Sequence, residues 1–90
     1  MMAPKHPMED VFIQKIQNTV ASIFKKEKPH DEFKTALLDH LERAQKLNAS
    51  HYETNVLNAL YINNVVFHPE DVLTSDDYLN RAYDAAQKNG

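Results

Sequence analysis

The sequence predicts an all-α fold, an antiparallel four-helix bundle with up-down-up-down topology, and three observations support it. Glycine occurs once, at Gly90, so the chain lacks the turn residues that tight β-hairpins need. Apolar residues recur at spacings of three and four in four segments, as on one face of an α-helix. Three of the four prolines lie near interruptions of this periodicity. We expect one helical domain over residues 1–90, with residues 1–7 flexible.

The first helix is expected to begin after Pro7. Glu9 and Asp10 then occupy its first turn, where the helix dipole favours negative charge. Its apolar face consists of Phe12, Ile16, Val20, Ile23 and Phe24. Positive charge near a helix C-terminus is also favourable, and the residues that provide it here are Lys25, Lys26 and Lys28. Pro29 prevents further continuation.

The second helix is expected to open at His30 or Asp31 and is the clearest amphipathic segment of the chain. Its apolar residues at near-heptad spacing are Phe33, Leu37, Leu41 and Ala44. The pattern breaks after Leu47, and Ser50 followed by Glu53 has the spacing of a capping box. A third helix should therefore start at that point.

The third helix is expected to bury an apolar face that begins at Tyr52 or Val56. The face continues through Leu57, Leu60, Tyr61 and Val65. The run 61–67 is rich in β-branched residues, which favour strands, but the chain offers no second strand to pair with it. A helix followed by a turn is therefore the better interpretation.

The fourth helix has two candidate starts. His68-Pro69 followed by acidic residues is typical of a start at Pro69, whereas Thr74 and Ser75 before two aspartates favour a start at Asp76. We favour the second. The residues expected to face the core are Leu79, Ala82, Tyr83 and Ala86.

The charge distribution argues against nucleic-acid binding. The formal net charge is −3, and the chain from Gln45 onward holds three basic and six acidic residues, whereas phosphate binding needs a basic surface. No apolar stretch has the length of a signal peptide core or of a spanning helix. We therefore expect a cytoplasmic protein, or one that is peripheral at the inner membrane face, without stable insertion into the membrane.

The sequence offers no pattern typical of an enzyme, a cofactor site or a metal site. Phosphate-binding loops and nucleophile elbows need glycines that the chain lacks, and cysteine is absent. No two of the five histidines are three or four residues apart, as a helical zinc pair requires. We expect these histidines to cap helices or face solvent, and the acidic pairs to stabilise helix starts.

From Phe33 onward the chain resembles the immunity proteins of pediocin-like bacteriocins, the enterocin A immunity family. Three features carry the resemblance. The first is the helix Phe33-Lys34-Thr35-Ala36-Leu37-Leu38-Asp39-His40-Leu41-Glu42, and the second is a capped third helix with Leu57, Leu60 and Tyr61. The third is the turn Val66-Phe67-His68-Pro69-Glu70 before a last amphipathic helix.

The resemblance implies a cytoplasmic bundle that guards the mannose phosphotransferase permease, the receptor of the bacteriocin, without performing a reaction. In that family the second half of the chain sets which bacteriocin is resisted. The partner-binding residues expected here are Asn80, Arg81, Asp84, Lys88, His68 and Glu70. We expect a monomer. The alternative hypothesis is a small helical adaptor or regulator that binds a soluble protein.

Overall fold

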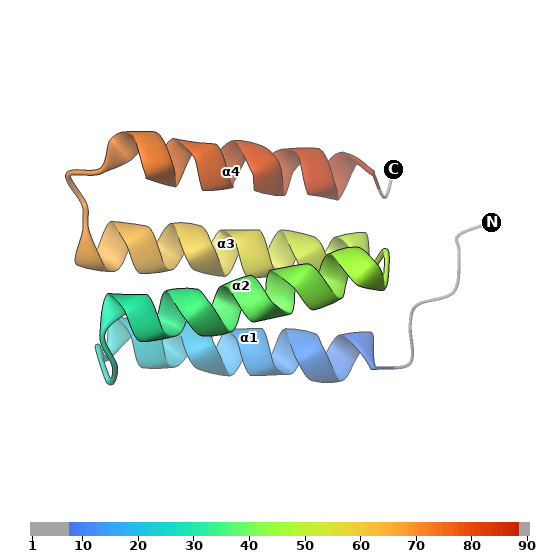
Figure 1. Cartoon of the computed structure of the whole chain (residues 1–90), viewed down its shortest axis with the longest axis horizontal. Helices are drawn as coiled ribbons and strands as arrows, with labels where there is room; N and C mark the ends of the chain where they lie inside the picture. Colours follow the sequence, from blue (N-terminus) through green and yellow to red (C-terminus); the bar gives the residue numbers. More distant parts are fainter. Residues whose placement is uncertain (1–7, 89–90) are drawn as a thin grey trace.

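A computed structural model describes residues 8–88, and this part of the chain forms four α-helices without a strand (Figure 1). The helices are α1 (Glu9–Phe24), α2 (His30–Lys46), α3 (Ser50–Phe67) and α4 (Val72–Gln87). The all-α class is thus confirmed. Within the described residues no helix is both long and apolar enough to cross a membrane. The expectation that residues 1–7 are flexible falls outside the described part.

Helices α1 and α2 end in the same way, although neither has a glycine at its end. Lys26 has a φ of 52°, and the N–H of Glu27 donates to the carbonyl of Ser22 at 3.2 Å. The N–H of Lys26 also donates to the carbonyl of Ile23 at 2.9 Å. Asn48 likewise has a φ of 52°, and the N–H groups of Asn48 and Ala49 make the two equivalent hydrogen bonds at the end of α2, at 3.1 and 3.0 Å. These are Schellman motifs, which satisfy the last carbonyls of a helix and turn the chain sharply.

The start and the end of α3 both differ from expectation. Ala49 is the N-cap, Ser50 is already helical, and no side chain caps the helix, so the predicted capping box does not form. The helix also continues through Val66 to Phe67, where a turn was expected. Its surroundings explain this, because α3 packs against all three other helices and burial outweighs the modest strand preference of β-branched residues.

Helix α4 begins at Val72, so both predicted starts, Pro69 and Asp76, are wrong. The cap is Asp71, whose Oδ1 accepts a hydrogen bond from the backbone N–H of Thr74 at 3.3 Å. The amide of Asn64 on α3 donates to the carbonyl of Asp71 at 3.1 Å and to Ser75 Oγ at 2.8 Å. These contacts hold Ser75 inside the helix and buried, which prevents it from acting as the cap.

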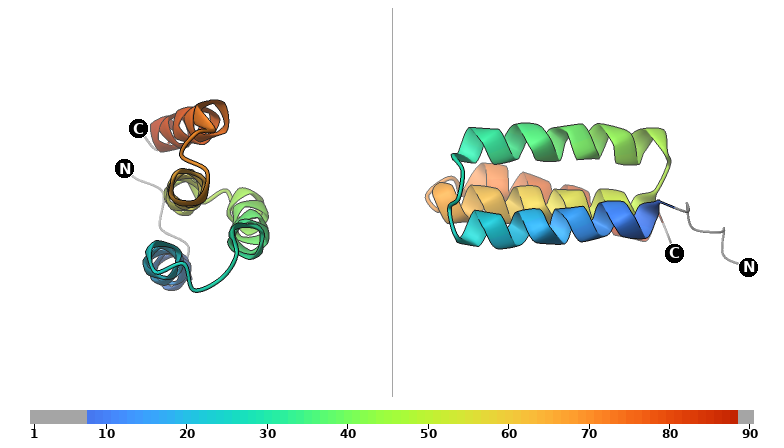
Figure 2. Two further views of the ribbon diagram at one scale, coloured as in Figure 1. Left: turned by 90° about the vertical axis from the view of Figure 1, so that its left-hand side faces the viewer. Right: turned by 90° about the horizontal axis from the view of Figure 1, so that it is seen from below.

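Helix α3 is the centre of the molecule. Figure 2 shows it between α4 on one side and the pair α1 and α2 on the other. Within the described residues, α4 packs closely against α3 alone. Among the residues expected in the core, Ile16, Leu37, Leu41 and Leu60 are buried and Phe12 is half-buried, whereas Leu79, Val65 and Phe24 are exposed. The core therefore surrounds α3, and α4 forms an outer layer on it.

Candidate partner-binding surface

The six residues predicted to contact a partner are all exposed. Asn80, Arg81 and Asp84 lie on α4 and Lys88 follows its last turn, while His68 and Glu70 lie in the connection between α3 and α4. Spacings of three and four residues place the α4 group on one side of the helix, away from its buried face. The structure thus gathers four of the six residues on a single polar surface.

Four of these six residues already take part in ion pairs within the molecule. Arg81 Nη1 lies 3.8 Å from Asp77 Oδ2, and His68 Nδ1 lies 3.6 Å from Glu70 Oε1. Lys88 Nζ lies 3.7 Å from Glu53 Oε1 on α3, so it connects the end of α4 to the central helix. Exposed pairs of this kind contribute at most about 1 kcal/mol, so a partner with better geometry can replace them.

Helix α4 also exposes apolar side chains that were expected in the core. Leu79 is 44% exposed and Tyr83 64% exposed, and Ala86 is exposed as well, so only Ala82 of the four predicted core residues is buried. The face that packs on α3 consists instead of Ser75, Tyr78, Ala82 and Ala85. Three of these four are small, and small side chains allow α4 to lie close to α3. A set of larger apolar residues therefore remains uncovered.

A polar cluster joins α2 to α3, and an aromatic ring of α1 packs against it. Tyr52 of α3 is fully buried, and its hydroxyl is hydrogen-bonded to Nδ1 of His40 on α2. Arg43 Nη1 lies 3.2 Å from His40 Nδ1 and 3.4 Å from the Tyr52 oxygen, and Arg43 Nη2 donates to Asp39 Oδ2 at 3.2 Å. The ring of Phe12 on α1 stacks on Tyr52 with centroids 5.2 Å apart.

The cluster favours uncharged forms of its two titratable rings. Burial lowers the pKa of His40, and the nearby positive charge of Arg43 lowers that pKa further. Burial also raises the pKa of Tyr52, so the phenol keeps its proton and donates to the neutral Nδ1. Since Nδ1 is already engaged and Tyr52 is fully buried, we interpret the cluster as a cross-link between helices. The expectation that His40 caps a helix or faces solvent is wrong.

The free energy of unfolding is expected to decrease as the pH falls below about 6.5, the ordinary pKa of histidine. The folded-state pKa of His40 is lowered, so the unfolded chain takes up the proton first and gains stability relative to the folded protein. His40→Gln should make this pH dependence shallower. Urea unfolding between about pH 5 and pH 8 measures the effect. The control is His51→Gln, at an exposed position on α3, and equal slopes for the parent and His40→Gln contradict this role.

A second pair of histidines, distant in sequence, meets at the other end of α2. The rings of His30 and His68 lie edge to face with centroids 4.6 Å apart, and His30 also contacts the ring of Phe67 at 5.8 Å. His30 is therefore part of the packing and not solvent-facing, whereas His51 and His68 are exposed as expected. His6 lies outside the described residues. Within residues 8–88 no group of three or more histidine or acidic side chains is placed to hold a metal ion.

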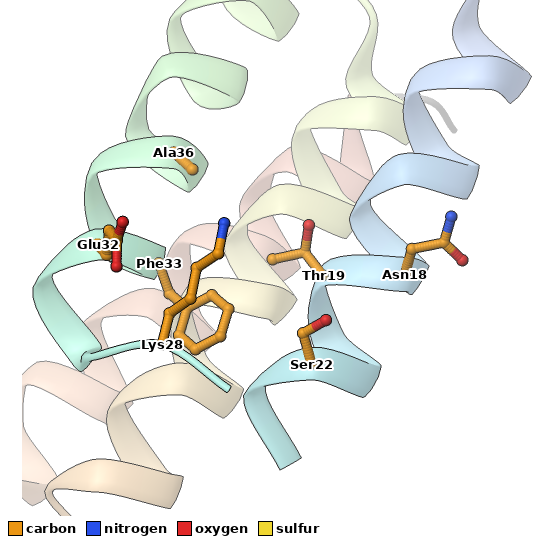
Figure 3. Close-up of a pocket in the computed structure, with 7 residues that line it drawn as sticks. All are labelled: Asn18, Thr19, Ser22, Lys28, Glu32, Phe33 and Ala36. Atoms are coloured by element: carbon orange, nitrogen blue, oxygen red, sulfur yellow. The ribbon is translucent and has the colours of Figure 1, made fainter. Parts of the chain in front are cut away.

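A shallow pocket lies between α1 and α2 (Figure 3). Figure 3 shows the α1 side chains on one side, the α2 side chains on the other, and Lys28 of the connection between them. The lining residues are Asn18, Thr19, Ser22, Lys28, Glu32, Phe33 and Ala36. Its volume is about 190 Å³, which is below the roughly 300 to 1,000 Å³ of small-molecule sites. The exposed surfaces of α4 are thus the stronger candidates for a binding role.

No protein-family model matches this chain, and no curated protein or solved structure matches it at a significant level. The candidate site is therefore defined by the surfaces of α4. Sequence reasoning missed that this helix has two apolar faces. Tyr78, Ala82 and Ala85 recur at spacings of four and three, which is the signal that could have identified the buried face.

Proposed function

We propose that this chain is a bacteriocin immunity protein, which protects the producing cell by binding the receptor permease of a pediocin-like bacteriocin. The permease is of the mannose phosphotransferase type, and binding takes place from the cytoplasm, at the inner face of the membrane. No reaction is involved. The resemblance of the helices and of the turn at His68 to the enterocin A immunity family supports the proposal.

The proposal includes the arrangement expected of that family, in which successive helices run in opposite directions, up-down-up-down. The connections between the helices support it. In Figure 1 the connections from α1 to α2 and from α3 to α4 lie at one end of the molecule, and the connection from α2 to α3 lies at the other. With this topology α4 presents its whole length on the outside of α3, where a partner has access to it.

The observation that carries a binding role is the exposed polar side of α4. Arg81 and Asp84 place opposite charges three residues apart on a helix that α3 holds through Asn64. A fixed pattern of charges on a rigid element favours specific partners, because a mismatched charge pattern is repelled. Such a surface fits a protein that discriminates among related complexes.

The second candidate function is a small helical adaptor that binds a soluble protein. The exposed apolar side chains of α4, Val72, Leu79 and Tyr83, favour it, because exposed apolar patches on small proteins often mark sites of protein association. This candidate needs no permease and no bacteriocin. The two functions can therefore be distinguished by testing whether a cell that expresses the protein resists a bacteriocin.

We expect a sensitive bacterium that expresses this protein to survive one or a few members of a panel of pediocin-like bacteriocins. Protein added outside the cells should have no effect, because the proposed contact lies on the cytoplasmic side. The measurement is the minimal inhibitory concentration of each bacteriocin with and without expression. If expression raises this concentration for no member, the immunity function is wrong and the adaptor takes its place.

Reversing two charges tests the surface separately from the function. Arg81→Glu combined with Asp84→Arg should reduce protection while leaving the circular dichroism spectrum unchanged, since exposed substitutions cost only about 0.5 kcal/mol. The matched control is Glu42→Lys with Lys46→Glu, which swaps an exposed ion pair on α2 whose atoms lie 3.2 Å apart. Full protection by the α4 variant would keep the function and move the contact surface elsewhere.

A further inference from the structure

Two histidines that are far apart in the sequence meet at one end of the molecule. His30 is the first residue of α2 and His68 directly follows α3, and Figure 1 shows these two helix ends on the same side of the bundle. Their ring centroids lie 4.6 Å apart, and the ring planes are inclined at 78°. Two imidazoles that bind one metal ion through nitrogens at about 2.0 Å, at a tetrahedral or slightly smaller angle, have centroids roughly 4.5 to 5 Å apart. The two rings are therefore at the separation that a shared metal ion requires.

We propose that His30 and His68 form a binding site for Zn²⁺ or a divalent transition-metal ion of similar chemistry. Each histidine contributes one ring nitrogen, and water completes the coordination, since zinc binds four ligands in all. This pair is smaller than the groups of three or more side chains that are absent from residues 8–88. The site does not depend on the proposed function, and it differs from the sequence-based expectation that the chain holds no metal.

Carboxylates determine which nitrogen of each ring is available to the metal. Asp31 Oδ1 lies 3.1 Å from His30 Nδ1, and Glu70 Oε1 lies 3.6 Å from His68 Nδ1. A carboxylate only accepts, so these contacts favour the neutral tautomer with its proton on Nδ1 and a lone pair on Nε2. Within residues 8–88 neither Nε2 atom has a hydrogen bond. Metal-binding histidines have the same arrangement, in which the second ring nitrogen donates to a carboxylate.

The two rings differ in how firmly the protein holds them. The His30 side chain is 17% exposed and packs against the ring of Phe67, and its backbone carbonyl accepts from the amide of Asn63 at 3.2 Å. The His68 side chain is 47% exposed, and exposed side chains change rotamer within nanoseconds. His30 thus provides a fixed ligand, and His68 is free to turn its Nε2 towards the same ion.

The charges around the pair favour a cation. Besides the two carboxylates that contact the rings, Asp71 lies close enough to His68 for their charges to interact. Lys26 opposes them, with its Nζ 5.7 Å from the centroid of the Phe67 ring. The carboxylates outnumber this ammonium group, so the local potential attracts a divalent cation.

A bound ion would link the start of α2 to the connection between α3 and α4. The two histidines are held together only in the folded chain, so the ion binds the folded state more tightly than the unfolded one and stabilises it. Zinc should therefore raise the midpoint of thermal unfolding of the parent protein and leave that of His68→Gln unchanged. An equal rise in both proteins contradicts the site.

Isothermal titration calorimetry of the untagged full chain with zinc chloride, at about pH 7.5 where the rings are neutral, measures the affinity. We expect one ion per chain, and His30→Gln and His68→Gln should each weaken binding at least tenfold. His68→Gln changes an exposed side chain, so it tests the site even if His30→Gln unfolds. The matched control is His51→Gln on α3, an exposed histidine that should leave the affinity unchanged.

Three calorimetric outcomes overturn the proposal. The first is the absence of heat from binding at about 1 mM zinc, a concentration at which even weak sites fill. The second is binding that survives both His30→Gln and His68→Gln. The third is an equal loss of affinity in His51→Gln, which would show an adventitious ion only.

Nitrogen NMR of the imidazole rings identifies the atoms that bind the metal. In the free protein we expect the proton on Nδ1 of both His30 and His68. Zinc should shift the Nε2 signals of both rings and leave the signals of His51 in place. Shifts confined to one of the two rings, or shifts that identify Nδ1 as the ligand, contradict the shared site.

Discussion

Leu41→Ala is expected to lower the free energy of unfolding by about 2 to 5 kcal/mol. Leu41 is 5% exposed and belongs to the hydrophobic cluster around α3, so its truncation removes buried apolar contacts and leaves a cavity. A domain of this size has a total stability of roughly 5 to 15 kcal/mol, so the loss is a large share. Urea unfolding followed by circular dichroism measures it.

The control for this substitution lies on the same helix. Leu38 precedes Leu41 by three residues but is 41% exposed, so Leu38→Ala should change the free energy of unfolding by only about 0.5 kcal/mol. The two substitutions remove the same atoms, so the difference between their free energies of unfolding reflects the difference in burial between Leu41 and Leu38. Equal losses for the two variants would contradict the packing of α2 against α3 described above.

Asn64→Ala is expected to cost about 2 to 4 kcal/mol and to loosen α4 in particular. The side-chain amide of Asn64 donates to the carbonyl of Asp71 and to Ser75 Oγ, and Asn64 is only 4% exposed. Its removal takes away the buried partner of Ser75 Oγ and one of two donors to the Asp71 carbonyl, which keeps the N–H of Ser75 at 3.3 Å. A buried polar group that loses its partner costs about 1 to 3 kcal/mol. The substitution also removes the side-chain hydrogen bonds that link α3 to the start of α4.

Hydrogen exchange locates the effect of this substitution. In Asn64→Ala the amides of Tyr78 and Ala82 on α4 should lose protection more than that of Ile16 on α1, because α4 packs closely against α3 alone. Asn58→Ala is the matched control, since Asn58 lies on the same helix but is exposed. Uniform loss of protection in all four helices would show that α4 does not open as a separate unit.

The sequence was most informative where a helix has a single apolar face. The spacings of Ile16 and Ile23 on α1, and of Leu37 and Leu41 on α2, identified buried residues correctly, because each of these helices has one apolar face and buries it mainly against α3. The lysines and Pro29 likewise marked the end of α1, since they act on the local backbone. Local signals of this kind require no knowledge of the rest of the fold.

The candidate site was predictable only in part. The polar character of Asn80, Arg81 and Asp84 predicted their exposure correctly. The exposure of Leu79 and Tyr83 was not predictable, because the spacing of apolar residues in a sequence does not show whether another helix covers them. The cluster of His40, Arg43 and Tyr52 was also missed, since it joins residues from two helices.

The sequence by itself determined the helical class, the positions of the connections within a few residues, and the apolar faces of α1 and α2, because these depend on propensity, capping and periodicity. The tertiary structure decided the rest. It made α3 the central helix and carried it through to Phe67, and it moved the start of α4 to Val72 through the contacts of Asn64. Tertiary packing also buries Tyr78 and leaves Leu79 exposed, because among the described residues α4 contacts α3 alone and only one of its two apolar faces is covered.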